Sequence, residues 1–172
     1  MHIRSHGFTL LELMTYLGIL SLLISIGIPE LNNMIYEQKL RKATQDLFLS
    51  AAIARSEAVK RNLPVLVMTN ADSWSNGWKV FVDHNNDGTR NQNEPVIAIT
   101  EKLDEILARG NTPVTSYIRF TPSGRPKLIG GGFQAGTITL CTASSKAVTR
   151  RLIMNASGRI RIKKSTTTAC NA

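Results

Sequence analysis

The strongest constraint in this sequence is an apolar run close to its N-terminus. The run covers Phe8 to Ile28 and contains a single charged residue, Glu12. In a helical conformation such a segment is about 30 Å long, the thickness of the hydrocarbon core of a bilayer. An acidic side chain inside the bilayer costs about 3 kcal/mol, so Glu12 needs a partner even near the end of the run. The sequence therefore predicts a transmembrane helix over residues 8–28.

A short polar segment, residues 1–7, precedes this run and ends in the small residue Gly7. A secretory signal peptide carries its small-residue cleavage site after the apolar run, whereas here the small residue comes first. Cleavage after Gly7 leaves the apolar run on the mature chain and creates a free amine on Phe8. That amine is a candidate partner for Glu12, in the same chain or in a neighbouring one. We therefore expect residues 1–7 to be a leader that is removed.

A second helical pattern follows the apolar run. The predicted helix over residues 29–63 has apolar residues at spacings of three and four, namely Leu40, Ala43, Leu47, Ala51, Ala54 and Ala58. This spacing forms one apolar stripe on a helix, and Pro64 ends the pattern. The sequence thus predicts one long helix whose second part is amphipathic.

Short segments of strand-forming residues, bounded by Gly, Pro, Asn and Ser, occupy residues 64–172. The expected strands are Val65–Thr69, Gly77–Asp83, Pro95–Leu103, Tyr117–Phe120, Gly136–Cys141, Ala147–Met154 and Arg159–Lys163. Strands at this spacing favour an antiparallel sheet. We therefore predict an α+β fold in which the long N-terminal helix packs on an antiparallel β-sheet domain.

The chain has two cysteines, Cys141 and Cys170. An even number beyond a membrane anchor suggests one disulfide, and two free thiols are the alternative. The bridge would close a loop of about 30 residues and stabilise the fold by about 3–4 kcal/mol.

A polar loop between two predicted strands matches the spacing of a calcium-binding loop. Its oxygen-bearing residues are Asp83, Asn85, Asp87 and Glu94, and Gly88 stands where such loops turn sharply. Calcium loops of this pattern join two helices, whereas the flanking segments here are predicted strands. Asp, Asn and Gly also build ordinary hairpin loops. The context favours a solvated loop without a cofactor, and calcium is the alternative.

The sequence contains no recognisable catalytic constellation. After the leader only one histidine remains, His84, and no nucleophile motif, phosphate-binding loop or zinc motif is present. We therefore expect a protein that is not an enzyme.

The charge of the chain is divided unevenly along the sequence. Residues 1–105 hold 10 Lys and Arg and all 12 Asp and Glu, whereas residues 106–172 hold 11 Lys and Arg and no acidic residue. Such a stretch favours an anionic partner, such as nucleic acid, an anionic lipid or an acidic protein surface. A solvated basic face that only aids solubility is the alternative.

Two segments of the basic part resemble each other, Ser123–Leu128 and Ser157–Ile162. In a strand the alternation after Gly158 places Arg159, Arg161 and Lys163 on one face, about 6.6 Å apart. Guanidinium groups at this spacing can follow a phosphate backbone. Few aromatic residues lie between the basic residues, so we expect DNA binding that is independent of base sequence. The candidate DNA-binding residues are Arg125, Lys127, Arg150, Arg151, Arg159, Arg161, Lys163 and Lys164.

The segment Gly7–Glu12 (GFTLLE) resembles the prepilin cleavage motif of type IV pilins and type II secretion pseudopilins. The resemblance implies cleavage after Gly7 by the prepilin peptidase, N-methylation of Phe8, and pairing of Glu12 with a neighbour's amine during assembly. It also implies that residues 8–28 lie in the bacterial inner membrane and later in the filament core, with a periplasmic C-terminal domain.

The remainder of the chain resembles the FimT/GspH group of type IV pilin-like proteins, on the Gly77–Asp83 stretch and the closing Ser-Gly-Arg turn. The segment Gly158–Arg161 resembles the GRxR motif of FimT minor pilins, which bind DNA in natural transformation. The resemblance implies a minor pilin of the type IV pilus that binds DNA through Arg159 and Arg161, with major and minor pilins as further partners. A minor pseudopilin of a type II secretion system, or a structural minor pilin that primes assembly, are the alternatives.

Overall fold

The computed structural model describes residues 9–142 and 149–165. It divides into two compact units, Met1–Ile35 and Tyr36–Ala172. One helix, α1 (Leu10–Arg61), begins in the first unit and continues into the second. The two units are described separately.

The first unit contains the N-terminal part of α1. Thr9 stands just before the helix, and its Oγ1 accepts a hydrogen bond from the backbone N–H of Glu12 at 3.2 Å. Thr followed three positions later by Glu is the pattern of a capping box, and an acidic residue in the first turn is favoured by the helix dipole. Within the described residues, no helix combines the length and the hydropathy required of a membrane span. Gly7 and Phe8 lie outside the described residues.

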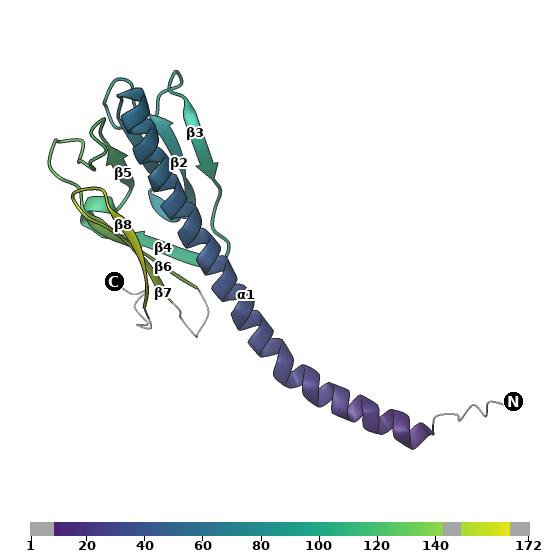
Figure 1. Cartoon of the computed structure of the whole chain (residues 1–172). Helices are drawn as coiled ribbons and strands as arrows, with labels where there is room; N and C mark the ends of the chain where they lie inside the picture. The colour runs from purple at the N-terminus through teal and green to yellow at the C-terminus, as the bar shows by residue number, and fades with distance from the viewer. Residues whose placement is uncertain (1–8, 143–148, 166–172) are drawn as a thin grey trace, which may run out of the picture. The chain divides into compact units, whose positions relative to one another are not determined.

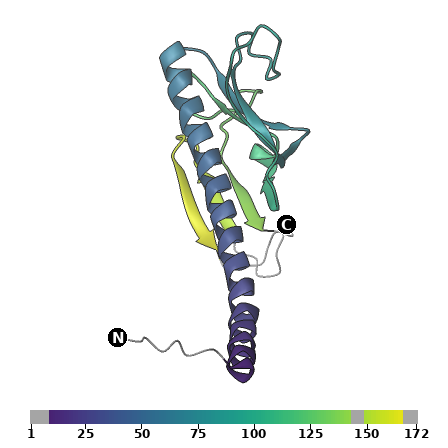
Figure 2. The same cartoon turned by 90° about the vertical axis from the view of Figure 1, so that its right-hand side faces the viewer.

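The second unit combines the C-terminal part of α1 with two four-stranded antiparallel sheets. Sheet A has the order β3 (Val96–Thr100), β2 (Ser73–Val82), β1 (Val65–Asn70), β5 (Tyr117–Phe120). Sheet B has the order β4 (Ile106–Gly110), β6 (Gly136–Thr142), β7 (Thr149–Met154), β8 (Ile160–Ser165). A short 3₁₀ helix, η1 (Thr112–Val114), follows β4. Figures 1 and 2 show the C-terminal part of α1 lying along both sheets.

The core of this unit lies between α1 and the two sheets. The apolar stripe predicted for the helix is buried, and Leu40, Leu47 and Ala51 are fully inaccessible to solvent. Two tryptophans of β2 are buried with them, and each satisfies its indole N–H: Trp78 donates to the Ser50 hydroxyl and Trp74 to the Val114 carbonyl, both at 2.9 Å. These hydrogen bonds offset the desolvation of the indole N–H groups, so the two large side chains are buried with no unsatisfied donor.

The predicted α+β architecture is confirmed, but two of its details were wrong. The strands form two sheets rather than one, and β4 (Ile106–Gly110) was not predicted. Its sequence, ILARG, is short and contains Ala, Arg and Gly, which have little strand preference. Pairing with β6 nevertheless makes it a strand, with Leu107 opposite Cys141 and Arg109 opposite Thr139.

The predicted disulfide involves one described cysteine. Cys141 is fully buried in β6, whereas Cys170 lies outside the described residues. The pairing of the two stays a prediction.

Candidate nucleic-acid interface

Sheet B is built wholly from the part of the sequence that lacks acidic residues. Its strands run from Ile106 to Ser165, and every Asp and Glu of the chain precedes residue 106. Alternate residues of a strand point to opposite faces, and directly paired residues of neighbouring strands share a face. The strand pairings therefore sort the basic residues into an inner face, which packs on the core, and an outer face.

The outer face of sheet B carries a row of basic residues. Arg109 of β4 is paired with Thr139 of β6, Thr139 with Arg151 of β7, and Arg151 with Lys163 of β8. Arg161 lies on the same face, two residues before Lys163 in β8. Arg109, Arg161 and Lys163 are exposed and Arg151 is half-buried. The predicted clustering of Arg161 and Lys163 on one face is thus confirmed, with Arg151 beside them.

Arg150 and Lys164 were predicted to widen this patch, but they lie on the inner face. Their Cα atoms are paired with each other, and both side chains reach a carboxylate of α1. The Nζ of Lys164 lies 2.9 Å from Oε1 of Glu37, and Nη2 of Arg150 lies 3.6 Å from the same oxygen. The hydrogen bond from Lys164 is the main reason that the pKa of Glu37 is lowered below 4.5. Both positive charges are therefore compensated within the fold.

The two similar Ser-Gly-Arg segments lie against each other. Gly124 and Gly158 both have a positive φ, of 71° and 81°. A Cβ on Gly158 would lie 2.8 Å from the carbonyl oxygen of Gly124, so the two turns are in direct contact. Arg55 of α1 holds the second turn, since its guanidinium donates to the carbonyls of Gly158 at 3.1 Å and of Ser157 at 3.5 Å.

Three further candidate residues belong to these turns. Arg125 and Arg159 each follow one of the two glycines, and Lys127 lies two positions beyond Arg125; all three are exposed. The sequence repeat therefore becomes one cluster of basic turns at the start of β8. The tertiary structure brings together residues that are more than 30 positions apart in the sequence.

The Asp83–Glu94 loop has its carboxylates hydrogen-bonded by its own backbone. Asp83 accepts from the N–H groups of Asp87 and Gly88 at 3.1 and 3.0 Å, and Glu94 accepts from those of His84 and Asn91 at 2.8 and 2.9 Å. Hydrogen bonds from Asn91, Thr89 and Asn85 lower the pKa of Asp87 well below its usual range. Among the described residues no group of three or more His, Cys, Asp and Glu is arranged to hold a metal ion.

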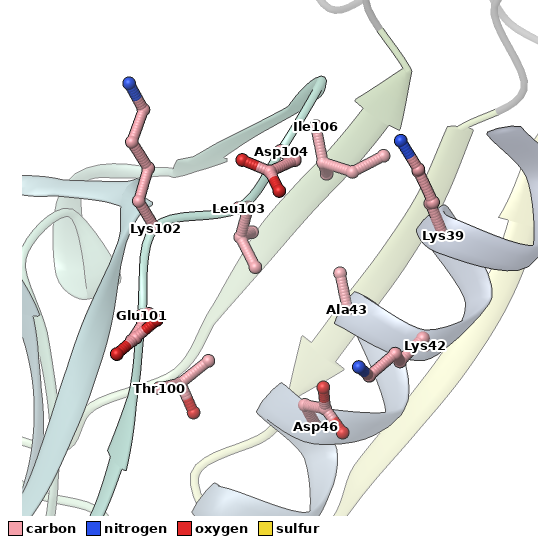
Figure 3. A pocket seen from close by; sticks show the side chains of 10 residues that line it. All are labelled: Lys39, Lys42, Ala43, Asp46, Thr100, Glu101, Lys102, Leu103, Asp104 and Ile106. Carbon is pink, nitrogen blue, oxygen red and sulfur yellow. The ribbon is translucent and has the colours of Figure 1, made fainter.

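A pocket beside α1 differs in charge from the outer face of sheet B. It has a volume of about 320 Å³ and lies between the helix and the segment from Thr100 to Ile106. Figure 3 shows basic and acidic side chains together around it, with Lys42 and Asp46 on the helix and Lys102, Glu101 and Asp104 on the facing segment. This mixed charge contrasts with the uniform charge of the outer face of sheet B.

Sequence reasoning missed two residues of the basic region. Arg109 was missed because β4 carries no strong strand signal. Arg55 was missed because nothing in the sequence pattern indicated that it holds a turn 103 residues further on. A count of the charges in residues 106–172 includes Arg109, but it does not show on which strand or face Arg109 lies.

The sequence matches two known families. Residues 43–158 match the family described as Type II transport protein GspH, and residues 3–28 match the prokaryotic N-terminal methylation motif. A curated relative, the pilin-like protein PilA1 of Thermus thermophilus, is 31% identical over 168 residues, which cover 91% of this chain and 97% of the relative.

Solved structures with the same fold include those of two other proteins. The type IV minor pilin FimU of Pseudomonas aeruginosa has a TM-score of 0.63 at 19% identity, over 79% of this chain and 96% of FimU. The minor pseudopilin EpsH of the Vibrio cholerae type 2 secretion system has a TM-score of 0.54 at 12% identity, over 73% of this chain and 97% of EpsH. The chain therefore belongs to the GspH family and is a type IV pilin-like protein.

Proposed function

We propose that this protein is a minor pilin that binds DNA through its basic C-terminal region, without regard to base sequence, and serves DNA uptake in natural transformation. One observation carries the proposal: a sheet face with exposed Arg161 and Lys163 and no acidic residue in any of its four strands. Surface cations without acidic neighbours attract phosphates, and arginine binds them through paired donors.

The same proposal assigns the remaining parts of the chain. The prepilin peptidase cleaves after Gly7 and Phe8 becomes N-methylated, in keeping with the matched methylation motif. The helix over residues 8–28 anchors the protein in the inner membrane before assembly. The protein acts by binding, with no catalytic step and no cofactor. Its partners are DNA and other pilins.

A second candidate function is a minor pseudopilin of a type II secretion system. The family description and the fold of EpsH favour it, and so does the pocket of mixed charge beside α1, because contacts between proteins combine both signs of charge with apolar area. Deleting the gene separates the candidates: loss of DNA uptake supports the first, and loss of secretion with normal uptake supports the second.

The direct test is a DNA-binding titration of the full chain in a non-ionic detergent. Labelled duplexes of two unrelated sequences are titrated at low and at physiological salt. We expect affinities of about 1 μM at low salt that are alike for both sequences and fall steeply as salt increases. The double variant Arg159→Gln/Arg161→Gln is expected to bind at least about tenfold more weakly.

A matched control removes the same charge elsewhere. The variant Arg90→Gln/Lys102→Gln also loses two positive charges, but from exposed positions outside sheet B. It should bind DNA within about twofold of the unchanged chain. If both variants bind DNA equally weakly, the binding depends only on net charge. If the folded Arg159→Gln/Arg161→Gln variant binds normally, the proposed site is refuted.

A further inference from the structure

Resting on the proposed function, we infer that the DNA is bound as a duplex across the outer face of sheet B, along the row of residues from β8 to β4, and that Arg109 of β4 is a further contact residue. The motif at the start of β8 marks only one edge of this surface. The opposite edge is β4, the strand that lies furthest from β8 in the order of the sheet.

The register of the sheet places Arg109 in line with the basic residues of the other edge. The pairs Arg109 with Thr139, Thr139 with Arg151, and Arg151 with Lys163 form one continuous row across four strands. All four residues lie on the outer face because paired residues share a face. Arg109 is exposed, so its guanidinium is available to a ligand on that face.

The spacing of these residues fits two phosphate backbones better than one. Strands lie about 4.8 Å apart, so three steps across the sheet separate Arg109 from Lys163 by about 14 Å, whereas Arg161 and Lys163 are about 6.7 Å apart along β8. A single strand that follows β8 would not reach Arg109. A duplex presents two backbones on either side of a groove that is about 6 or about 12 Å wide, and so offers phosphates to both edges of the face.

The side chains between the two edges also favour a duplex. The outer-face positions of the central strands include Thr137 and Thr139 of β6 and Arg151 and Ile153 of β7. None of the outer-face residues of the four strands is aromatic. Proteins that bind single strands usually stack the bases on aromatic side chains. Threonine hydroxyls, in contrast, are common donors to the phosphates of a duplex.

The charge of the face is not neutralised from within the fold. The carboxylate of Glu37 is directed to Arg150 and Lys164, on the inner face. Among the described residues, no ion pair involves Arg109, Arg151, Arg161 or Lys163. The four cations therefore act together on a ligand at the outer face.

The test compares Arg109→Gln with the control Arg90→Gln, which removes the same charge from an exposed loop. Each full-length variant is titrated with a duplex and with one of its single strands at several salt concentrations. We expect Arg109→Gln to weaken duplex binding about fivefold, to lower the slope of log K against log salt by about 0.9, and to change single-strand binding less than about twofold. Arg109→Lys should keep the slope, because it keeps the charge.

The outcomes separate this inference from the function on which it rests. If Arg159→Gln/Arg161→Gln abolishes duplex binding but Arg109→Gln behaves like Arg90→Gln, DNA binding stands and the wider surface is refuted. Equal weakening of duplex and single-strand binding by Arg109→Gln would refute the duplex assignment. If the unchanged chain binds neither form of DNA, the proposed function itself fails.

Discussion

Two surfaces of the globular unit, the pocket beside α1 and the outer face of sheet B, differ in how their charges are arranged. The pocket is lined by Lys42 and Asp46 of the helix and by Lys102 and Asp104 of the facing segment, so it combines both signs of charge (Figure 3). Sheet B, in contrast, presents cations on its outer face and no acidic residue in its strands. The first surface is suited to contact with another protein and the second to a polyanion.

This difference follows from the order of the chain. The helix, sheet A strands β1 to β3 and their loops come from residues before 106, which hold every acidic residue, whereas sheet B comes from residues after 105. Because each sheet takes its central strands from one part of the sequence, a charge imbalance along the chain becomes a charge imbalance in space.

Reversing charges on each surface in turn is the strongest test of this contrast. Arg161→Glu/Lys163→Glu should weaken DNA binding about 100-fold, since two attractive groups become repulsive. The control Lys42→Glu/Lys102→Glu makes the same change in net charge at the pocket of mixed charge beside α1. It should weaken DNA binding less than about threefold. Similar losses measured by titration for the two variants would show that the location of the charge is irrelevant.

The turn that presents Arg159 is expected to depend on Gly158. Gly158→Ala places a Cβ 2.8 Å from the Gly124 carbonyl oxygen at a φ of 81°, and should lower the free energy of unfolding by about 2–3 kcal/mol. Gly130→Ala is the control, because a Cβ there has no neighbour within 4 Å. Chemical denaturation measures both, and a Gly158 variant as stable as the Gly130 variant would contradict the close contact of the two turns.

The ion pairs of Glu37 should contribute a smaller, pH-dependent stabilisation. The lowered pKa of Glu37 means that the folded state favours its ionised form, so the stabilisation is present above pH 4.5 and is lost as the pH falls through the lower folded-state pKa. Glu37→Gln should cost less than about 1 kcal/mol at neutral pH. Below the folded-state pKa of Glu37, the variant and the unchanged chain should be equally stable in thermal unfolding.

The variant Glu37→Gln also tests whether Arg150 and Lys164 are kept away from DNA on the inner face of sheet B. Because Arg150 and Lys164 lie on the inner face, removing the charge of Glu37 should leave DNA affinity within about twofold of the unchanged chain. A large gain in affinity would mean that these two residues reach the DNA once they are released.

The smallest effect is expected for calcium. The carboxylate oxygens of Asp83 and Glu94 already accept backbone hydrogen bonds, so we expect the loop to fold without a metal. Calcium at about 1 mM should shift the Tm by less than about 1 °C. A shift of several degrees that a chelator reverses would instead support the calcium alternative.

Much of this fold could be predicted from local sequence signals. The stripe from Leu40 to Ala58 indicated the buried helix face, and Tyr117–Phe120 was predicted with its observed bounds. Such signals are strong because the period of the apolar residues matches the geometry of the element. The strand Ile106–Gly110 carries no such signal, and only its pairing with β6 makes it a strand.

The part of the candidate site that could be predicted is the part where a local sequence pattern fixes the face of the side chains. Alternation along β8 correctly placed Arg161 and Lys163 together. It did not place Arg150 and Lys164, whose face and ion pairs depend on β7 and on Glu37, more than 110 residues away along the chain.

The sequence by itself determined the N-terminal motif, the long helix, the antiparallel strands and the segregation of acidic residues to the first part of the chain. These features follow from residue type and spacing alone. Only the tertiary structure decided which cations share a surface, because the pairing of distant strands sets the face of each side chain. It compensates Arg150 and Lys164 with Glu37 and places Arg109 in line with Arg151 and Lys163.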